Sequence, residues 1–320
     1  MITVPSKKQV QKAGKLLAED TATSEEFAQA MATLSDWRAL HNYPINTFQA
    51  TLRGKVKKLG FKSPIIAQRL KRTPSIVRKL QRFPNMNLAR MQDIGGIRIV
   101  LANVAEVYRL HTNILNSKRP FEHEPLLPPK DYIKEPKSDG YRSLHQVFKY
   151  KSTTYPELDG LQIELQIRTK LQHAWATAVE TLGIIEKSSF KTGEGSEEFK
   201  RFFMLASALF SYNERQPILP ALADIPIKEI AKELRALEAK LQIFAKLQGL
   251  IVTAKHIETS SPKSDEYHLM ELDTSKESPA ISLIPFTKSQ LEMAESIYKM
   301  REIETQDKPY IELVLISTPF

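Results

Sequence analysis

Residues 160–169 constrain the fold more than any other stretch, because apolar side chains recur there at every second position. A period of two predicts a β-strand with one apolar and one polar face. The polar face carries a carboxylate between two amides, followed by a cation: Gln162, Glu164, Gln166 and Arg168. Such a face is usually the exposed side of a sheet, and the alternative is the floor of a pocket. Both interpretations require a sheet whose other face is covered.

A proline-rich basic loop precedes this strand. Prolines and a glycine between residues 128 and 140 interrupt any helix or strand pattern, and Ser138-Asp139-Gly140 is a turn sequence. The loop holds four cations and an aromatic side chain: Lys130, Lys134, Lys137, Arg142 and Tyr141. Cations bind phosphate and an aromatic ring stacks on a base, so the loop suits a phosphorylated nucleotide. The alternative is a solvated basic loop.

A second basic cluster surrounds a predicted strand-to-helix junction. Polar and apolar residues alternate from Ile65 until a break before Thr73, which predicts a strand, and a helix is expected from Pro74, with Thr73 or Ser75 near its cap. Four cations flank the junction: Arg69, Lys71, Arg78 and Lys79. A helix N-terminus with several cations can bind a triphosphate. The sequence contains no Walker motif, so a P-loop is excluded.

Asp93 precedes a continuous apolar segment that ends at Leu101, with Gly95 and Gly96 between them. The apolar segment predicts a strand, and the glycines allow another backbone to approach closely. An aspartate beside a triphosphate site could bind Mg²⁺, which takes one or two carboxylates together with phosphate oxygens. Spacing alone favours a turn-forming aspartate.

Charge is distributed unevenly along the chain. The net charge is +9, yet the 56 residues from Trp37 to Gln92 contain 13 Lys and Arg and no acid, so the remainder carries −4. This acid-free segment predicts a surface for polyanions such as nucleotide phosphates or RNA. A basic surface that only aids solubility is the alternative.

Three ordered motifs resemble the synthetase domain of the RelA/SpoT family, which transfers the β,γ-pyrophosphate of ATP to a ribose 3′-hydroxyl. They are Asp93-Ile-Gly-Gly-Ile-Arg98, the loop from Pro136 to His145, and Glu164-Leu-Gln-Ile-Arg-Thr169. The resemblance covers roughly residues 40 to 215.

The resemblance implies roles for particular residues. Asp93 and Glu164 would be catalytic and hold Mg²⁺. ATP would bind through Arg69, which stacks on adenine, and through Lys71, Ser75, Lys79 and Arg98. The acceptor would bind Lys130, Lys137, Tyr141, Arg142, His145, Gln166 and His173, with Tyr141 stacking on its base. His111 is instead expected to be a core or surface histidine.

We expect an α+β fold: a mixed, nucleotidyltransferase-like sheet flanked by helices, then a long helix from Ile227 to about Leu250 and a small β-β-β-α-β domain. Prolines 217, 220 and 226 place the domain boundary between residues 219 and 220. The β-β-β-α-β strands are expected at 250–258, 267–273, 280–285 and 310–317, with a helix at 288–304. Residues 226–320 carry 12 basic and 15 acidic residues, so this part could dock on a basic domain.

Composition limits the remaining possibilities. The chain has no cysteine, which excludes disulfides and thiolate metal sites. No apolar run approaches the ~18 residues of a membrane span, and the first residues lack a signal-peptide core. We therefore expect a cytoplasmic protein without membrane association. No histidine–aspartate cluster precedes residue 40, so we expect no hydrolase domain.

A synthetase without a hydrolase would be toxic unless restrained. The motif after Glu164 resembles the fused toxin–antitoxin (CapRel-like) small alarmone synthetases of anti-phage defence, which modify the 3′ CCA end of tRNA. This resemblance implies an antitoxin-like, pseudo-zinc-finger-like C-terminal domain that senses a phage protein. The branch also carries Tyr-x-x-Tyr after its last strand, which is absent after Ser317. The acceptor alternatives are tRNA and GDP or GTP, and a third possibility is an inactive nucleotide or RNA sensor.

Overall fold

The computed structural model describes residues 4–19, 22–83, 85–117, 123–185, 196–244, 247, 267–273, 280–305, 308 and 311–317. The chain divides into two compact units. The first unit comprises Met1–Leu101, Ala105–Lys130 and His145–Ile167. The second comprises Ala102–Val104, Asp131–Leu144 and Arg168–Phe320.

The first unit begins with three helices, which are followed by strands and further helices in mixed order. A few end residues of these elements belong to the second unit. The elements are α1 (Lys7–Ala18), α2 (Ser24–Ala39), α3 (Asn42–Lys58), β1 (Ile65–Leu70), α4 (Thr73–Arg82), the 3₁₀ helix η1 (Leu88–Arg90), β2 (Gly95–Leu101), α5 (Val104–Leu115), β3 (Glu124–Asp131), β4 (Leu144–Lys149), the 3₁₀ helix η2 (Pro156–Leu158) and β5 (Gln162–Thr169).

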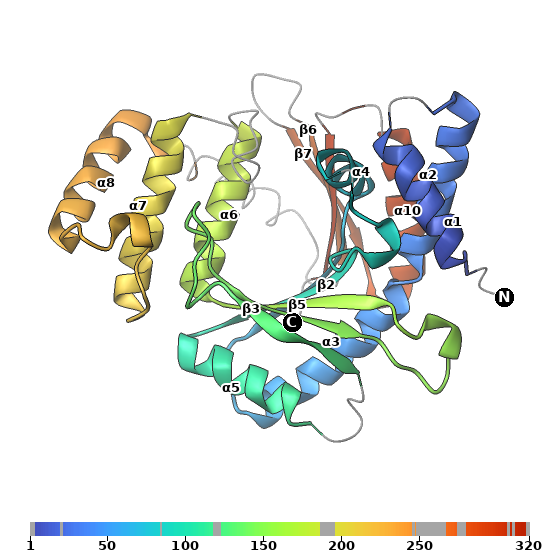
Figure 1. Cartoon of the computed structure of the whole chain (residues 1–320), viewed down its shortest axis with the longest axis horizontal. Helices are drawn as coiled ribbons and strands as arrows, with labels where there is room; N and C mark the ends of the chain where they lie inside the picture. Colours follow the sequence, from blue (N-terminus) through green and yellow to red (C-terminus); the bar gives the residue numbers. More distant parts are fainter. Residues whose placement is uncertain are drawn as a thin grey trace. The chain divides into compact units, whose positions relative to one another are not determined.

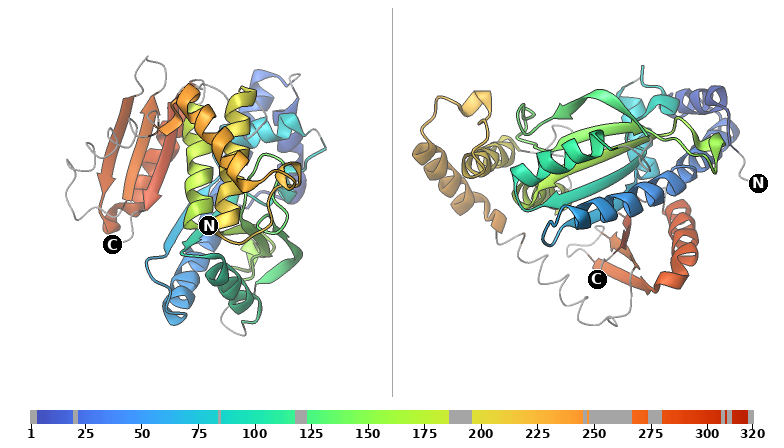
Figure 2. Two further views of the ribbon diagram at one scale, coloured as in Figure 1. Left: turned by 90° about the vertical axis from the view of Figure 1, so that its left-hand side faces the viewer. Right: turned by 90° about the horizontal axis from the view of Figure 1, so that it is seen from below.

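The five strands form one mixed sheet in the order β1-β2-β5-β4-β3. Strand β1 pairs antiparallel with β2, with Arg69 opposite Gly96. Helices α3 and α5 cover one face of this sheet (Figures 1 and 2). The predicted mixed sheet flanked by helices is thus confirmed.

The alternation in β5 divides the two faces of the sheet as predicted. Ile163, Leu165 and Ile167 are fully buried on the covered face, where each large aliphatic side chain contributes on the order of 2 kcal/mol. His111 of α5 is also buried there, within hydrogen-bond distance of Gln146 (3.2 Å), so of the two expected places, core or surface, it occupies the core. The opposite face of β5 keeps Glu164 and its polar neighbours.

The sequence interpretation missed strand β3, because its prolines were expected to interrupt any strand. Strand β3 lies at the edge of the sheet, where proline is tolerated because one side of the strand needs no backbone N–H donors. The Gln146 amide donates to the Leu126 carbonyl (2.8 Å), which ties β3 to β4.

Helix α4 begins as expected, with Pro74 in its first turn and Thr73 next to its N-cap. The N-cap is Arg72, whose side chain makes no capping hydrogen bond. The helix N-terminus therefore offers backbone donors to a ligand.

The second unit contains the following elements: α6 (Lys170–Ile185), α7 (Glu197–Asn213), the 3₁₀ helix η4 (Pro220–Leu222), α8 (Ile227–Leu241), β6 (Tyr267–Asp273), β7 (Ala280–Phe286), the 3₁₀ helix η5 (Lys288–Gln290), α10 (Leu291–Glu304) and β8 (Ile311–Ser317). Helices α7 and α8 share a core that includes Leu205, Leu219 and Ile230. This packing spans the boundary predicted between residues 219 and 220.

Helix α8 is shorter than predicted. It ends at Leu241, and Gln242 follows in the left-handed conformation (φ 51°), so a continuous helix to Leu250 is wrong. Strands β6, β7 and β8 form an antiparallel sheet in the order β7-β6-β8. Helix α10 packs on it through Ala294, against Leu269, Phe286 and Leu313. These elements match the prediction for residues 267–317, and the strand expected at 250–258 lies outside the described residues. Within the described ranges, no helix is long and apolar enough to cross a membrane.

Candidate active site

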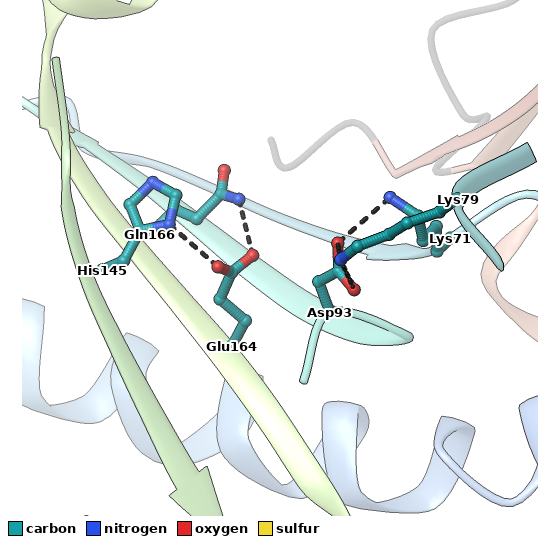
Figure 3. A network of polar contacts seen from close by, with 6 residues as sticks. All are labelled: Lys71, Lys79, Asp93, His145, Glu164 and Gln166. Carbon is teal, nitrogen blue, oxygen red and sulfur yellow. Dashed lines mark hydrogen bonds and ion pairs between the residues drawn. The ribbon is translucent and has the colours of Figure 1, made fainter. Parts of the chain in front are cut away.

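Asp93 is held between two lysines just before β2. The ammonium group of Lys79 lies 2.9 Å from both carboxylate oxygens, and that of Lys71 lies 3.1 Å from Oδ2. Lys71 directly follows β1 and Lys79 lies on α4, so the strand-to-helix junction and the start of β2 meet at this carboxylate (Figure 3). Three residues from separate motifs are thereby brought together.

The electrostatics of this cluster follow from its partial burial. Burial by itself raises the pKa of Asp93, but Lys71 and Lys79 outweigh it, so the pKa of the carboxyl group lies below its ordinary value. Burial also lowers the pKa of Lys71, which the Asp93 charge only partly offsets. Asp93 is therefore a carboxylate at neutral pH, with two cations ready for an anionic ligand.

Glu164 contacts a histidine and an amide in place of lysines. The Nδ1 of His145, the second residue of β4, lies 2.8 Å from its Oε1, and the Gln166 amide donates to its Oε2 at 2.8 Å (Figure 3). The His145–Glu164 contact crosses between neighbouring strands, whereas Gln166 shares the polar face of β5 with Glu164.

The two carboxylates influence each other. Burial raises the pKa of Glu164, and the charge of Asp93 raises it further. The hydrogen bond and charge interaction with His145, together with the hydrogen bond from Gln166, outweigh both. The net direction is downward, so Glu164 is also ionised at neutral pH. Two ionised carboxylates therefore lie within electrostatic reach of each other on the same side of the sheet (Figure 3).

Two glycines allow the strands that carry these groups to approach. A Cβ atom at Gly95 would lie 3.0 Å from Ile163 and 3.1 Å from Ile45, on the covered face. Gly96 faces the opposite way, and a Cβ atom there would lie 3.5 Å from the Glu164 carbonyl oxygen. The cross-strand partner of Gly96 is Arg69, which is exposed and belongs to the polar face together with Arg98. Both predicted ATP-binding arginines thus lie on the face of Glu164, and Ser75 lies half-buried in the first turn of α4.

The carboxylate pair fits a hard divalent cation. Oxygen ligands from one or two carboxylates suit Mg²⁺, which keeps water or phosphate oxygens as its remaining ligands. No group of three or more His, Asp or Glu suited to a metal occurs among the described residues. Asp93 and Glu164 would hold the ion.

The loop of residues 131–144 carries the predicted acceptor-binding side chains Lys137 and Tyr141. The Lys137 ammonium lies 5.0 Å from the centre of the Tyr141 ring and 4.8 Å from that of Tyr132. The sequence analysis missed Tyr132, although an aromatic residue beside two loop cations was a usable indication. Lys130, just before the loop, is exposed.

Arg142 differs from the other predicted acceptor-binding residues because it is buried. Its three nitrogens donate to Ser207 Oγ (3.1 Å), the Ile133 carbonyl (3.0 Å) and the Pro217 carbonyl (2.7 Å). Burial lowers its pKa to about 10, so the guanidinium remains charged at neutral pH. In this structure Arg142 therefore holds the loop, and its predicted contact with acceptor phosphates stays a prediction.

His173, the last of the predicted acceptor-binding residues, lies near the start of α6. Arg168 Nη2 donates to its Nδ1 at 2.8 Å, so this nitrogen accepts and carries no proton. Its predicted acceptor role remains a prediction.

Comparison with known proteins agrees with these motifs. Residues 68–194 match a family model described as a region found in RelA / SpoT proteins. The GTP pyrophosphokinase YjbM of Bacillus subtilis is 32% identical over 149 residues, which cover 43% of this chain and 69% of YjbM. The GTP pyrophosphokinase YwaC of the same organism is 32% identical over 114 residues, covering 34% of this chain and 52% of YwaC. The crystal structure of small alarmone synthetase 1 from Bacillus subtilis bound to its product pppGpp aligns with a TM-score of 0.47 and 25% identity, covering 55% of this chain and 89% of that one.

The chain belongs to the RelA/SpoT synthetase family. The matching relatives are named GTP pyrophosphokinases, which agrees with the predicted enzyme class, a pyrophosphokinase of the RelA/SpoT synthetase type. The chain spans about half of the length of YwaC and about two thirds of that of YjbM.

Proposed function

We propose that the protein is an ATP-dependent pyrophosphokinase that transfers the β,γ-pyrophosphate of ATP to a ribose 3′-hydroxyl. The observation that carries this proposal is the pair of ionised carboxylates, Asp93 with two ammonium groups and Glu164 with two hydrogen-bond donors. Pyrophosphoryl transfer depends on positioning and charge neutralisation more than on covalent chemistry of the protein, and this site supplies both.

On the ATP side, the lysines exchange partners. Without nucleotide, Lys71 and Lys79 neutralise Asp93. When ATP binds, the triphosphate takes these ammonium groups and the uncapped N-terminus of α4, and Arg69 stacks on the base. The Asp93 carboxylate is then free to hold Mg²⁺ together with Glu164. The ion neutralises phosphate charge, which is the chemistry it supplies when bound.

On the acceptor side, Glu164 accepts the proton of the 3′-hydroxyl while His145 and Gln166 fix its orientation. The 3′-oxygen forms a bond to the β-phosphorus, the bond from that phosphorus to the α,β-bridging oxygen breaks, and AMP leaves. The 131–144 loop supplies Tyr141 for the base, with Lys137 and Lys130 for phosphates.

The acceptor we favour is the 3′ CCA end of tRNA. Of the 13 cations in the acid-free segment, eight are exposed: Arg53, Lys57, Lys58, Lys62, Arg69, Arg78, Arg82 and Arg90. Lys71 and Lys79 face Asp93, and Arg38 donates to the Lys71 carbonyl. These three cations therefore have partners within the protein and are not counted as part of an RNA-binding surface. A mononucleotide does not need so many exposed cations, whereas an RNA backbone does.

A guanosine nucleotide is the second candidate acceptor, because the matching relatives are named GTP pyrophosphokinases. In that case the product would be guanosine tetra- or pentaphosphate. The basic surface would then have another partner or serve solubility.

Modification of tRNA would block translation, so the proposal includes a restraint. The C-terminal part of the chain, with three more acidic than basic residues in 226–320, acts as this restraint until a phage protein binds it. The supporting observation is the resemblance of the sequence to toxin–antitoxin synthetases of anti-phage defence.

The test offers the purified protein γ-³²P-ATP and Mg²⁺ with deacylated tRNA, GDP or GTP in parallel. Label on tRNA supports the favoured acceptor, and label on guanosine nucleotides alone supports the second. A protein that binds ATP but labels none of them, even after deletion of residues 226–320, would contradict the enzymatic proposal and favour a sensor.

A further inference from the structure

We infer that Ser207 of α7 is a positioning residue for the acceptor, acting through the 131–144 loop. This inference rests on the proposed function, in which that loop binds the acceptor. Ser207 lies outside the region matched by the family model, which ends at residue 194, and its own sequence surroundings do not suggest a role.

The Ser207 hydroxyl bridges two loop residues. It donates to the Gly140 carbonyl at 2.6 Å and accepts from Arg142 Nε at 3.1 Å. Gly140 and Arg142 flank Tyr141 in the sequence, so one buried hydroxyl fixes the backbone on one side of the ring expected to stack on the base and the Arg142 side chain on the other. Ser207 is 2% exposed, and water therefore cannot readily replace it.

Gly140 can approach α7 only because it lacks a side chain. Its φ is 96°, and a Cβ atom there would lie 2.9 Å from Ser207 Cβ and 3.2 Å from Trp175 Cζ2. Both the conformation and the contact therefore require glycine. The close approach places the Gly140 carbonyl within reach of the hydroxyl.

The same turn of α7 also holds Trp175, whose ring contacts Tyr141. The Trp175 indole N–H donates to the Phe203 carbonyl at 2.8 Å, and the Trp175 and Tyr141 rings meet edge to face at 6.4 Å. Arg142 adds its bonds to the Ile133 and Pro217 carbonyls. The segment from Phe203 to Ser207 thus orients the loop through a ring contact and a polar contact.

Removing the hydroxyl would leave a buried carbonyl and a buried guanidinium nitrogen each short of a partner. Such a loss favours loop conformations in which these groups reach water. For Ser207→Ala we expect the KM for the acceptor to rise about tenfold, the scale of losing hydrogen bonds at a binding loop. The KM for ATP should not change.

The experiment combines kinetics with hydrogen–deuterium exchange of the full chain. Ser211→Ala is the matched control, because Ser211 is fully buried one turn further along α7 and its hydroxyl donates to the Ala208 carbonyl of the same helix. Ser207→Cys, which keeps the volume but donates weakly, should show an intermediate effect if Ser207→Ala does not fold.

The expected result is faster exchange in residues 131–144 and a raised acceptor KM in Ser207→Ala, with Ser211→Ala unchanged in both. Unchanged exchange in the loop would overturn the inference. Faster exchange with an unchanged KM for every acceptor would instead overturn the assignment of this loop to the acceptor, and with it that part of the proposed function.

Discussion

Asp93 and Glu164 are both partly buried, ionised carboxylates, but their partners differ in kind. Asp93 contacts two ammonium groups, whereas Glu164 contacts an imidazole and an amide. The lysines can leave Asp93 for a triphosphate, because phosphate is a stronger anionic partner. His145 and Gln166 instead fix the orientation of Glu164. The difference supports the proposal that Asp93 acts on the ATP side and Glu164 as the proton acceptor of one site.

The largest effect should come from Glu164→Gln, which keeps the size and removes the proton acceptor. We expect a loss of kcat on the order of 10³-fold, in the range of general-base catalysis, with the affinity for ATP measured without Mg²⁺ retained. Transfer assays and ATP titration measure the two quantities. Glu157→Gln, an exposed site on η2, is the matched control. An active Glu164→Gln enzyme would contradict the assignment.

Asp93→Asn should cost on the order of 10²-fold in kcat, the loss expected when one charged group that stabilises the transition state is removed. Lys71 and Lys79 would lose their anionic partner, so ATP measured without Mg²⁺ should bind at least as tightly as to the wild type. Calorimetry with EDTA present measures this, with Asp36→Asn on the exposed face of α2 as control. Weaker metal-free binding of ATP would show that the lysines do not exchange partners.

Lys79→Met should raise the KM for ATP about tenfold, since a charge-assisted bond to phosphate is lost. It should also raise the pKa of Asp93, because one of the cations that lower it is gone. Initial rates at varied ATP test the first effect, with the exposed Lys8→Met as control. An equal rise in the acceptor KM would argue that Lys79 does not belong to the ATP side.

His145→Phe should have the smallest effect, expressed in the pH dependence. Glu164 must be ionised to accept a proton. The transfer rate therefore reaches its maximum above the pKa of Glu164 and falls as the pH drops through that pKa. His145 lowers this pKa, and its removal raises the pKa. The acid limb of the pH–rate profile should therefore move to higher pH. An unmoved limb would mean that another group controls it.

Local patterns in the sequence were sufficient for some parts of this account. The alternation in residues 160–169 predicted the strand and its polar face, and the cations around Pro74 predicted the helix-terminal cluster. Strand β3 could not be predicted, because proline is compatible with a strand only at a sheet edge, and edge position is set by tertiary pairing. The contact of His145 with Glu164 depends on register between strands, and the buried position of Arg142 depends on α7. Neither is encoded in local spacing.

The central claim is that Asp93 and Glu164 hold one metal ion for the same reaction. Electron paramagnetic resonance can measure Mn²⁺ binding in the presence of α,β-methylene-ATP, which tests this claim without turnover. We predict that the wild type binds Mn²⁺ in the presence of this nucleotide and that Asp93→Asn and Glu164→Gln each weaken binding by about tenfold or more. Wild-type affinity in the Glu164→Gln variant would contradict the claim.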